Sequence, residues 1–326
     1  MNLPLRHAFS VACVVLALGL PAGARAQDYP NKPVRLIVGF APGGINDLVA
    51  RIVAENLTPL LKQTVLVENR PGAGATVAAD LVAKSKPDGY TLLLGSVSNI
   101  AMAPSQYKAL TYDPAKDFAP IAPVAGAACI LVVNPKFPAH SVNEVIALAK
   151  QKPGEYVYGS GGLGSSTHFV VELFTSMAGI NIGHTAYKGD GPSVADVVAG
   201  HIPMAFPTVP AAMPFIKSGQ LRALAVSTAS RSSFLPELPT VSEAGLPGFE
   251  VNIWLGVLAA PATPRDIVAR LNSDIAAVTR QQNVRERLAT LGAEPLASSP
   301  EQFSAYIKTE IVKWTNVAKA AKMPQN

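Results

Sequence analysis

The chain has 326 residues, of which 49% are apolar and only 15% are charged, with 27 Lys and Arg against 22 Asp and Glu. Charged residues make up about 25% of an ordinary soluble domain, so this composition excludes a largely disordered chain, and the length predicts two domains with sizeable cores. Two cysteines exclude a disulfide framework, and the lack of any run of Lys and Arg argues against a nucleic-acid binder.

The N-terminus predicts a secretory signal peptide over residues 1–26. A basic start is followed by an apolar stretch up to Leu20 and by the small-residue motif Ala-Arg-Ala that ends at Ala26. About 12 apolar residues are too few to span a membrane, which needs about 20. We therefore expect cleavage after Ala26 and a soluble periplasmic protein. Cleavage removes Cys13, so Cys129, which lies in an apolar segment, is expected to be a buried free thiol.

Short β-rich runs alternate with helical patterns after the leader, which is typical of a parallel sheet with helices on its faces. Val34 to Val38 predicts the first strand, Pro42-Gly43-Gly44 ends it, and apolar residues at helical spacing from Leu48 to Leu60 predict the first helix. Further strands are expected at 64–67, 90–94, 130–133, 156–158, 182–185, 204–206 and 221–226. Further helices are expected at 76–83, 142–149, 169–177 and 194–198.

Helices are expected in the last part of the chain. Thr263 is expected to cap a helix with Pro264 at its first position and Asp266 at its third, and Ser299 is expected to begin the last helix in the same way. Before them, the apolar run 251–259 predicts a long strand that returns to the first lobe. We expect the chain to end in helices without further strands.

The first candidate site is the glycine turn from Phe40 to Asp47, which joins a strand to a helix. Gly43 and Gly44 let a ligand approach the backbone, and the helix start offers unpaired N–H groups to an anion. Asp47 lies in the first helical turn, where it can contact a ligand or neutralise its own helix terminus. The sequence leaves both roles open.

A second glycine turn, 159–168, gathers four glycines with hydroxyl and imidazole side chains between a strand and a helix. Its G-x-G-x-x-G spacing is that of a dinucleotide fingerprint, but no acid ends the next strand to bind a ribose, so NAD is not expected. A secreted serine hydrolase that uses Ser165 or Ser166 with His168 is the alternative function. Asp190 or Asp196 could complete its triad, yet the chain has no G-x-S-x-G motif.

The third candidate segment is Tyr187-Lys188-Gly189, which again lies between a strand and a helix. Lys188 can face an anionic ligand or the solvent, and the sequence leaves both open. Neither a phosphate-binding loop for nucleoside triphosphates nor a metal-ligand spacing of His and Cys occurs, so no cofactor and no metal are expected.

Taken together, the segments resemble the substrate-binding receptors of tripartite tricarboxylate transporters, also called the Bordetella uptake gene (Bug) family. The matching motifs run in family order over the whole mature chain: Arg35-Leu36-Ile37-Val38, Ala41-Pro42-Gly43-Gly44 with Asp47, 67–74, Pro87-Asp88-Gly89-Tyr90-Thr91-Leu92, 158–162, Gly164-Ser165-Ser166-Thr167-His168, Tyr187-Lys188-Gly189, 221–226, Leu238-Pro239-Thr240 and Pro247-Gly248-Phe249-Glu250.

The resemblance implies an α/β, type II-like periplasmic binding protein fold of two lobes, each a mixed sheet flanked by helices, with the ligand cleft between them. Lobe 1 is expected at 27–127 and 246–326, and lobe 2 at 128–245. The family also implies small carboxylate ligands and no catalysis. The ligand site it implies consists of Phe40, Ala41, Gly43, Gly44, Asp47, Ser96, Ser160, Gly164, Ser165, Ser166, Thr167, His168, Tyr187, Lys188, Gly189 and Pro207.

Two positions depart from the family pattern. His184-Thr185-Ala186-Tyr187 stands where the family usually has His-Val-Pro-Tyr, and Pro207 stands where an acidic or small polar residue is common. Proline offers neither a charge nor an N–H group. If Pro207 faces the cleft, a ligand amino group loses a partner, so we expect a plain mono- or dicarboxylate, aromatic acids included, in preference to an amino acid.

The sequence thus leads us to expect an extracytoplasmic receptor that captures a small carboxylate between two lobes for uptake or sensing. Its expected partner is a set of membrane transporter subunits or a sensor ectodomain, and we expect a monomer that binds no nucleic acid. Recognition by backbone amides carries little side-chain code, so the sequence leaves the identity of the ligand open. It also leaves open whether cognate membrane subunits exist.

Overall fold

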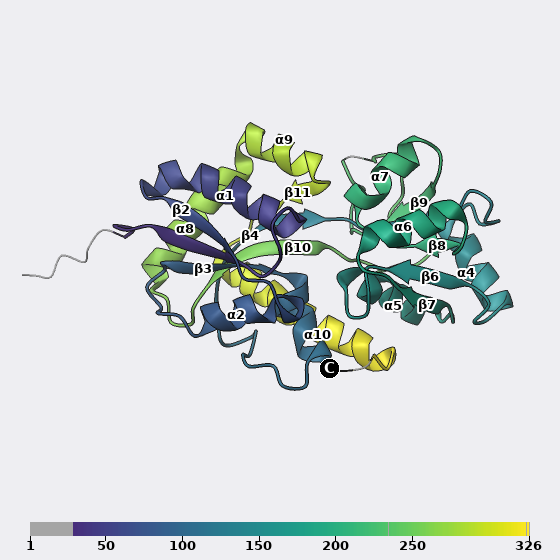
Figure 1. The fold of residues 1–326 in the computed structure, drawn as a ribbon, viewed down its shortest axis with the longest axis horizontal. Coiled ribbons are helices and arrows are strands. Elements are labelled where there is room, and N and C mark those ends of the chain that lie inside the picture. Colours follow the sequence, from purple (N-terminus) through teal and green to yellow (C-terminus); the bar gives the residue numbers. More distant parts are fainter. Residues whose placement is uncertain (1–28, 234, 324, 326) are drawn as a thin grey trace, which may run out of the picture.

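The computed structural model describes residues 29–233, 235–323 and 325, so the expected leader, 1–26, lies outside the described part of the chain. Two β-sheets, each flanked by helices, form two lobes that lie side by side (Figure 1). Over the same residues, no helix is long and apolar enough to cross a membrane.

The first lobe contains a six-stranded sheet in the order β11-β4-β10-β3-β1-β2. Strand β1 pairs in parallel with β2 and β3, whereas β10 is antiparallel to both β3 and β4. Strands β1 to β4 therefore all run in one direction. The strand bounds are β1 Val34–Val38, β2 Val65–Asn69, β3 Thr91–Ser96, β4 Ala119–Ala127, β10 Ile253–Ala259 and β11 Ala293–Pro295.

The second lobe repeats this arrangement with a five-stranded sheet in the order β7-β6-β8-β5-β9. Strand β6 is parallel to β7 and β8, and β5 is antiparallel to β8 and β9. Strand β5 lies fourth when this sheet is counted from β7, as β10 does when the first sheet is counted from β2. The strand bounds are β5 Ile130–Val133, β6 Val157–Ser160, β7 Gly183–Ala186, β8 Met204–Ala205 and β9 Arg222–Val226.

Helices cover the faces of both sheets (Figure 1). Those that flank the first sheet or connect its strands are α1 Ile45–Leu61, α2 Thr76–Ala83, a π-helical segment Val97–Met102, α3 Ala103–Gln106, α8 Arg265–Arg280, α9 Gln282–Thr290 and α10 Pro300–Ala320. Those of the second lobe are α4 Val142–Gln151, α5 Ser166–Ala178, α6 Asp190–Ala199 and α7 Val209–Lys217.

The connection between the lobes sets the direction of both sheets. Strand β4 ends at Ala127 and β5 begins at Ile130, so the chain crosses between lobes within three residues. The carboxyl end of β4, and with it the carboxyl ends of β1 and β3, therefore points toward the second lobe. Because β6, β7 and β8 run opposite to β5, their carboxyl ends point back toward the first lobe. The topology thus places the carboxyl edges of the two sheets opposite each other.

Ser227 joins the two segments that cross between the lobes. Its side chain is fully buried. The Ser227 hydroxyl accepts the amide of Cys129, in the first crossing, at 2.9 Å and donates to the carbonyl of Val251, in the second, at 2.8 Å. Just before Val251, the Phe249 ring stacks on that of Phe206, with centroids 6.0 Å apart. The second crossing is therefore packed on the side of lobe 2.

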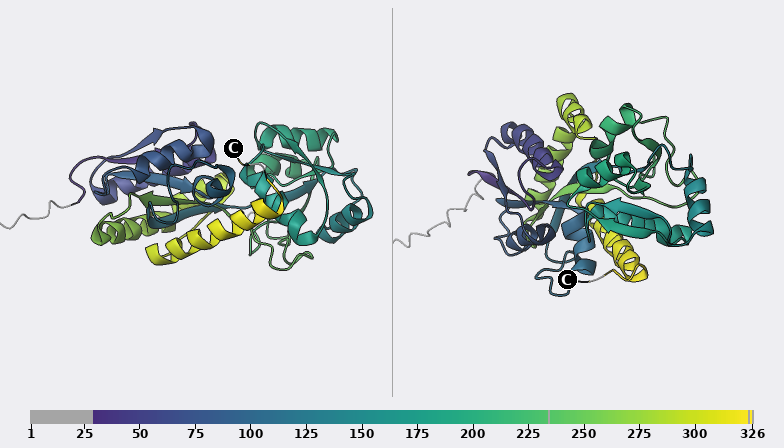
Figure 2. Two further views of the ribbon diagram at one scale, coloured as in Figure 1. Left: turned by 90° about the horizontal axis from the view of Figure 1, so that it is seen from below. Right: turned by 45° about the vertical axis from the view of Figure 1, so that its right-hand side comes forward.

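Helix α10 lies against both lobes. Figure 2 shows it running along the underside of the molecule from the first lobe to the second. Trp314 of α10 is fully buried and meets Phe169 of α5 edge to face, with ring centroids 5.6 Å apart. This contact links the C-terminal helix to the start of a lobe 2 helix.

Most elements expected from the sequence form within a few residues of their expected bounds, but two expectations were wrong and one long strand was missed. Helix α8 begins at Arg265 with Pro264 as its N-cap, because the Thr263 hydroxyl donates instead to the carbonyl of Ala260 at 2.7 Å. The C-terminal part contains a strand, β11, that pairs with β4. The nine-residue strand β4 was not expected at all. Cys129 is a buried free thiol, as expected.

Candidate functional site

The candidate site lies where the carboxyl edges of the two sheets face each other. In α/β folds, the helix that follows a strand begins at the strand's carboxyl end, so its unpaired N–H groups gather at that edge. Helix α1 follows β1, α5 follows β6 and α6 follows β7. The N-termini of these three helices, each of 10 or more residues, therefore point into the region between the lobes. Such termini favour anions.

In the first lobe, the Asp47 carboxylate forms hydrogen bonds within the protein. The residue is 2% exposed, and its carboxylate accepts hydrogen bonds from the Gly43 amide at 2.9 Å, from Arg51 Nε at 3.0 Å and from Asn69 Nδ2 at 2.9 Å. Burial raises the pKa of this carboxyl, but the hydrogen bonds outweigh it and hold the pKa at about 2. Asp47 is therefore an ionised anchor of the β1–α1 turn.

The backbone of the same turn is open to solvent. Ala41, Gly43 and Gly44 are exposed and Phe40 is half-buried, while the Phe40 carbonyl accepts Asn69 Nδ2 at 2.9 Å. Helix α1 starts after Gly44 with no side-chain cap, so its first-turn amides keep no side-chain partner. These amides are the groups that this lobe can offer to an anion.

Sequence reasoning missed Asn46 in this turn. Its Oδ1 atom is buried and has no hydrogen-bond partner in the described part of the chain. Buried polar atoms are nearly always paired, so an unpaired one in the first turn of α1, at the carboxyl edge of β1, is a candidate ligand contact. The signal in the sequence was only an amide among glycines.

Ser96 ends β3 at the same edge but faces inward. It is 3% exposed, and both its amide and its hydroxyl donate to Asn99 Oδ1, at 2.8 and 3.1 Å. These bonds cap the π-helical segment that follows β3. The Ser96 hydroxyl therefore stabilises this edge of the sheet, and its one donor is not free for a ligand between the lobes.

In the second lobe, the turn after β6 is held by its own hydroxyls. Ser160 is 1% exposed, and its hydroxyl accepts the Gly162 amide at 3.2 Å. Ser165 caps α5 by accepting the His168 amide at 3.2 Å. Gly164 has a φ of +73°, which a glycine adopts without strain. Its carbonyl accepts Gln106 Nε2 of α3 at 2.5 Å, a hydrogen bond between the lobes.

Asp190 ties three helix starts together, a role that the sequence did not reveal. Thr167, at the start of α5, accepts the Gly161 amide at 2.9 Å and donates to Asp190 Oδ1 at 3.1 Å. Asp190 Oδ2 accepts the amide and the hydroxyl of Thr208, which precedes α7, at 3.1 and 2.9 Å. Both carboxylate oxygens are thus taken by protein donors.

A stack of one phenol ring and two imidazoles lies beside this turn. The His184 ring stacks on Tyr158 and on His168, with centroids 4.7 and 4.1 Å away. His184 Nε2 is 2.6 Å from the Ser160 hydroxyl, and burial together with the neighbouring His168 lowers the pKa of His184 to about 4. His184 is therefore neutral at neutral pH and holds the Ser160 side chain.

The hydrolase alternative is not supported by this geometry. His168 Nδ1 accepts the Gly164 amide at 3.1 Å, and its Nε2 lies 3.5 Å from Glu172, so neither ring nitrogen meets Ser165 or Ser166. Among the described residues, the one serine hydroxyl within hydrogen-bonding distance of an imidazole nitrogen is that of Ser160, which is buried and held within its turn. A nucleophile needs an aligned base and access to substrate.

The third segment and Pro207 complete the lobe 2 edge. The Tyr187 hydroxyl donates to Asp196 Oδ2 at 2.6 Å, and burial together with this bond raises the pKa of Tyr187 to about 12. The Gly189 amide donates to the Gly161 carbonyl at 3.1 Å, and Lys188 is exposed. Pro207 is buried just after β8, and its carbonyl accepts the Ile130 amide at 2.9 Å.

The described residues contain no group of three or more His, Cys, Asp or Glu that could hold a metal ion. Two sheets with facing carboxyl edges, joined by two short crossings and lined by helix N-termini, define a two-lobe solute-binding protein. The model of the tripartite tricarboxylate transporter family receptor matches residues 49–323, and the chain belongs to this family. The family and the two-lobe α/β fold expected from the sequence are confirmed.

Named relatives agree with this assignment. Protein BugT of Bordetella pertussis is 37% identical over 310 residues, which cover 95% of both chains. The structure of R. palustris Rpa4515 with adipate is 37% identical, has a TM-score of 0.78 and covers 92% of this chain and 100% of its own. MatC from Rhodopseudomonas palustris with bound malate is 31% identical, has a TM-score of 0.73 and covers 89% and 99%.

Proposed function

We propose that this protein is a periplasmic receptor that captures a small carboxylate between its lobes and delivers it to a membrane transporter. The observation that carries the proposal is the convergence of three helix N-termini on facing sheet edges, which suits carboxylate groups. Two similar structures hold adipate and malate, both dicarboxylates. Export through a leader cleaved after Ala26 and a monomeric state belong to the same proposal.

The site residues divide into two groups in this proposal. Ser166, Lys188 and Asn46 have no hydrogen-bond or ion-pair partner among the described residues, so these side chains and the exposed backbone of the β1–α1 turn are the groups that contact the ligand. The remaining polar side chains position the turns. These are Asp47, Ser96, Ser160, Ser165, Thr167, His168 and Tyr187.

The ligand is a plain carboxylate, aromatic acids included, and not an amino acid. An ammonium group needs a carboxylate partner, but the carboxylates of Asp47, Asp190 and Asp196 each accept several protein donors already. Pro207 adds neither charge nor N–H at this edge. A buried ammonium without a partner is costly, so amino acids are disfavoured.

The lobes of this receptor are 27–127 with 246–326, and 128–245, with one refinement. Phe249 stacks on Phe206 and meets Phe174, both in lobe 2. We therefore place the second crossing after Val251, next to Ser227. Ligand that contacts both edges favours the closed arrangement of the lobes.

Thermal unfolding of the mature chain, refolded to remove bound ligand, tests this function. The panel contains mono-, di- and tricarboxylates, aromatic acids and amino acids. A ligand at about 100 times its Kd adds about 2.7 kcal/mol of stability, a shift of a few degrees for a chain of this size. A shift confined to plain carboxylates supports the proposal. Tighter binding of aspartate or glutamate overturns the ligand class, and a cooperative transition that no carboxylate shifts overturns the function.

A further inference from the structure

Helix α10 has one buried and one exposed face on opposite sides, and the residues of each face recur at intervals of three or four. One face is buried and packs on both lobes through Phe303, Ile307, Glu310, Trp314 and Val317. The other, here called the α10 face, points to solvent along the underside of the molecule (Figure 2). Its residues follow each other at intervals of three or four, which keeps them on one side of a helix. On α10 they are Glu301, Ser304, Lys308, Val312, Thr315 and Lys319, and Lys322 lies just beyond the end of the helix.

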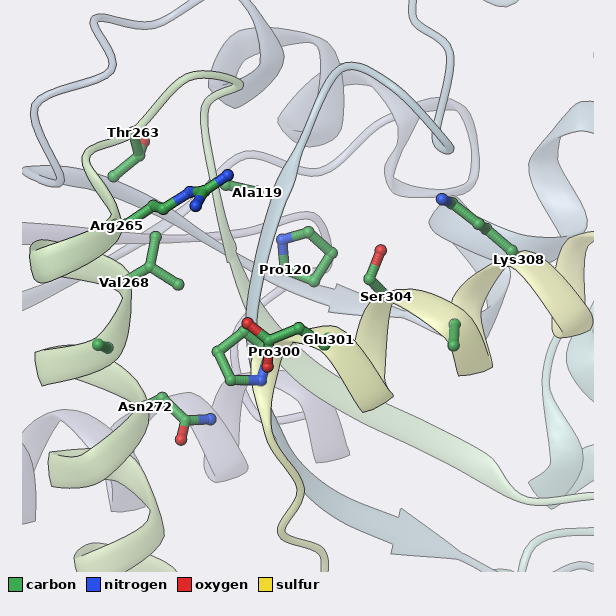
Figure 3. A pocket seen from close by; sticks show the side chains of 12 residues that line it. Ala119, Pro120, Thr263, Arg265, Val268, Asn272, Pro300, Glu301, Ser304 and Lys308 are labelled. Atoms are coloured by element: carbon green, nitrogen blue, oxygen red, sulfur yellow. The ribbon is translucent and has the colours of Figure 1, made fainter.

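A hollow lies at each end of the α10 face. The first has a volume of about 870 Å³ between α8, the start of β4 and the first turns of α10, and Figure 3 shows Arg265 and Lys308 on opposite sides of it. The second, of about 430 Å³, lies between α3 and the end of α10, with Lys108, Lys319 and Lys322 in its lining. The apolar side chain of Val312, 61% exposed, stands on the face between them.

Among the described residues, the cations of the α10 face and of the two hollows form no ion pair, although Arg265 interacts electrostatically with Glu301. No acid among residues 29–233, 235–323 and 325 forms an ion pair with any of these five cations, which are Arg265, Lys308, Lys108, Lys319 and Lys322. The acid that lines the hollows is Glu301, and its carboxylate accepts the Ser299 hydroxyl at 2.8 Å. By contrast, Lys313 on the flank of the helix pairs with Glu310 at 3.0 Å. The face and its two hollows therefore carry more positive than negative charge.

We propose that the α10 face docks an acidic segment of a protein partner, with carboxylates entering both hollows and an apolar residue covering Val312. Charge complementarity favours an anionic partner, and clustered charges mainly direct and orient such an encounter. Two hollows with an apolar side chain between them match the relief of a protein better than the plane of a lipid surface. The proposal concerns a surface remote from the ligand turns and goes beyond the receptor function.

Fluorescence anisotropy of a fluorescein-labelled oligoglutamate peptide, titrated with the mature full-length chain, tests the proposal. The test variant is Lys308→Glu/Lys319→Glu/Lys322→Glu. The matched control, Lys86→Glu/Lys136→Glu/Lys217→Glu, reverses three exposed lysines elsewhere that also lack ion pairs in the described structure. Both variants change the net charge equally, so a difference between them reports position. Circular dichroism and the carboxylate thermal shift confirm that both variants fold and keep the ligand site.

The α10 variant is expected to bind the peptide at least about tenfold more weakly than the control, because three attractions become repulsions. Equal loss in the two variants, or no binding by the unaltered chain, overturns the proposal. Vesicles of phosphatidylglycerol and phosphatidylcholine form the second arm. Binding to these vesicles that the α10 variant loses, without peptide binding, also overturns it and assigns the face to a membrane surface. Peptide held in the ligand site would survive in the α10 variant, which contradicts the proposal equally.

Discussion

Asp47 illustrates how a single residue can have two sequence-compatible roles that only its contacts decide. A carboxylate in the first turn of a helix either neutralises that terminus or meets a ligand. The structure gives Asp47 donors from Gly43, Arg51 and Asn69, the last from a neighbouring strand. The carboxylate therefore fixes the turn whose amides are left open. Because the pKa of Asp47 is about 2, the contribution of its carboxylate to the stability of the turn depends on pH.

Replacing Asp47 with Asn is expected to cost about 2 kcal/mol of stability at neutral pH, because a folded pKa of about 2 lies below the ordinary value of 3.8. A lowered folded pKa means that this stability is present above the unfolded pKa and is lost as the pH falls from about 4 to about 2. Urea unfolding of both proteins across this range measures it. The unaltered chain should lose this stability, and the variant should not.

Asp266→Asn is the matched control, because Asp266 also lies in a first helical turn, that of α8, but is exposed. It should leave the acid limb of the stability curve unchanged. If Asp47→Asn behaves like Asp266→Asn, the hydrogen bonds to Asp47 do not anchor the turn.

Among the elements, the two C-terminal helices show that similar sequences can begin helices differently. Both Thr263-Pro264 and Ser299-Pro300 have the pattern of an N-cap followed by proline. Ser299 accepts the Gln302 amide at 3.2 Å, and Gln302 accepts the Ser299 amide at 3.0 Å, a reciprocal capping box. Thr263 instead serves the turn after β10. The difference arises because a glutamine stands at the third helical position only in α10.

Ser299→Ala is expected to destabilise the protein by about 1 kcal/mol, since the N-cap hydroxyl is lost and the Gln302 amide is left without its acceptor. Chemical denaturation measures the loss. Ser304→Ala on the same helix is the control, because the Ser304 hydroxyl has no hydrogen bond in the described structure and alanine favours helix. Equal effects of the two variants would contradict the capping assignment.

At the scale of the whole molecule, two short crossings and one helix join the lobes. Ser227 binds both crossings with a single hydroxyl, and Trp314 of α10 meets Phe169 of lobe 2. Gln106 adds a hydrogen bond across the lobes at the site itself. When the lobes move relative to each other, the chain must therefore bend near Ser227. The same movement acts on the hydrogen bond from Gln106 to the Gly164 carbonyl.

Ser227→Ala is expected to cost about 3 kcal/mol, because the buried Cys129 amide and the Val251 carbonyl lose the one hydrogen-bond partner that each has in the described part of the chain. The midpoint of urea unfolding should fall accordingly. Ser218→Ala, at an exposed serine after α7, should change stability by less than about 0.5 kcal/mol. A Ser227 variant as stable as the Ser218 variant would show that the two crossings do not depend on this hydroxyl.

Local patterns predicted much of this fold. Alternating strands and helices indicated a parallel sheet with helices on its faces, and most of the expected elements lie within a few residues of their expected bounds. Strand β4 was missed because Pro120 and Pro123 interrupt it. Both prolines lie where the pairing of β4 with β10 shifts register, so the irregular pairing tolerates a residue without an N–H group.

The sequence by itself determined the family, most of the alternating strands and helices and the glycine turns at the candidate site, because these depend on spacing between neighbours along the chain. Only the tertiary structure decided which polar groups remain free for a ligand. Asp190 reaches Thr208, and Asp47 reaches Asn69, through contacts between residues distant in sequence. The tertiary structure also brings Lys108 and Arg265 close to α10, although these positive charges form no run in the sequence. Hydrogen bonds and surface charge depend on distance in space, which local spacing does not encode.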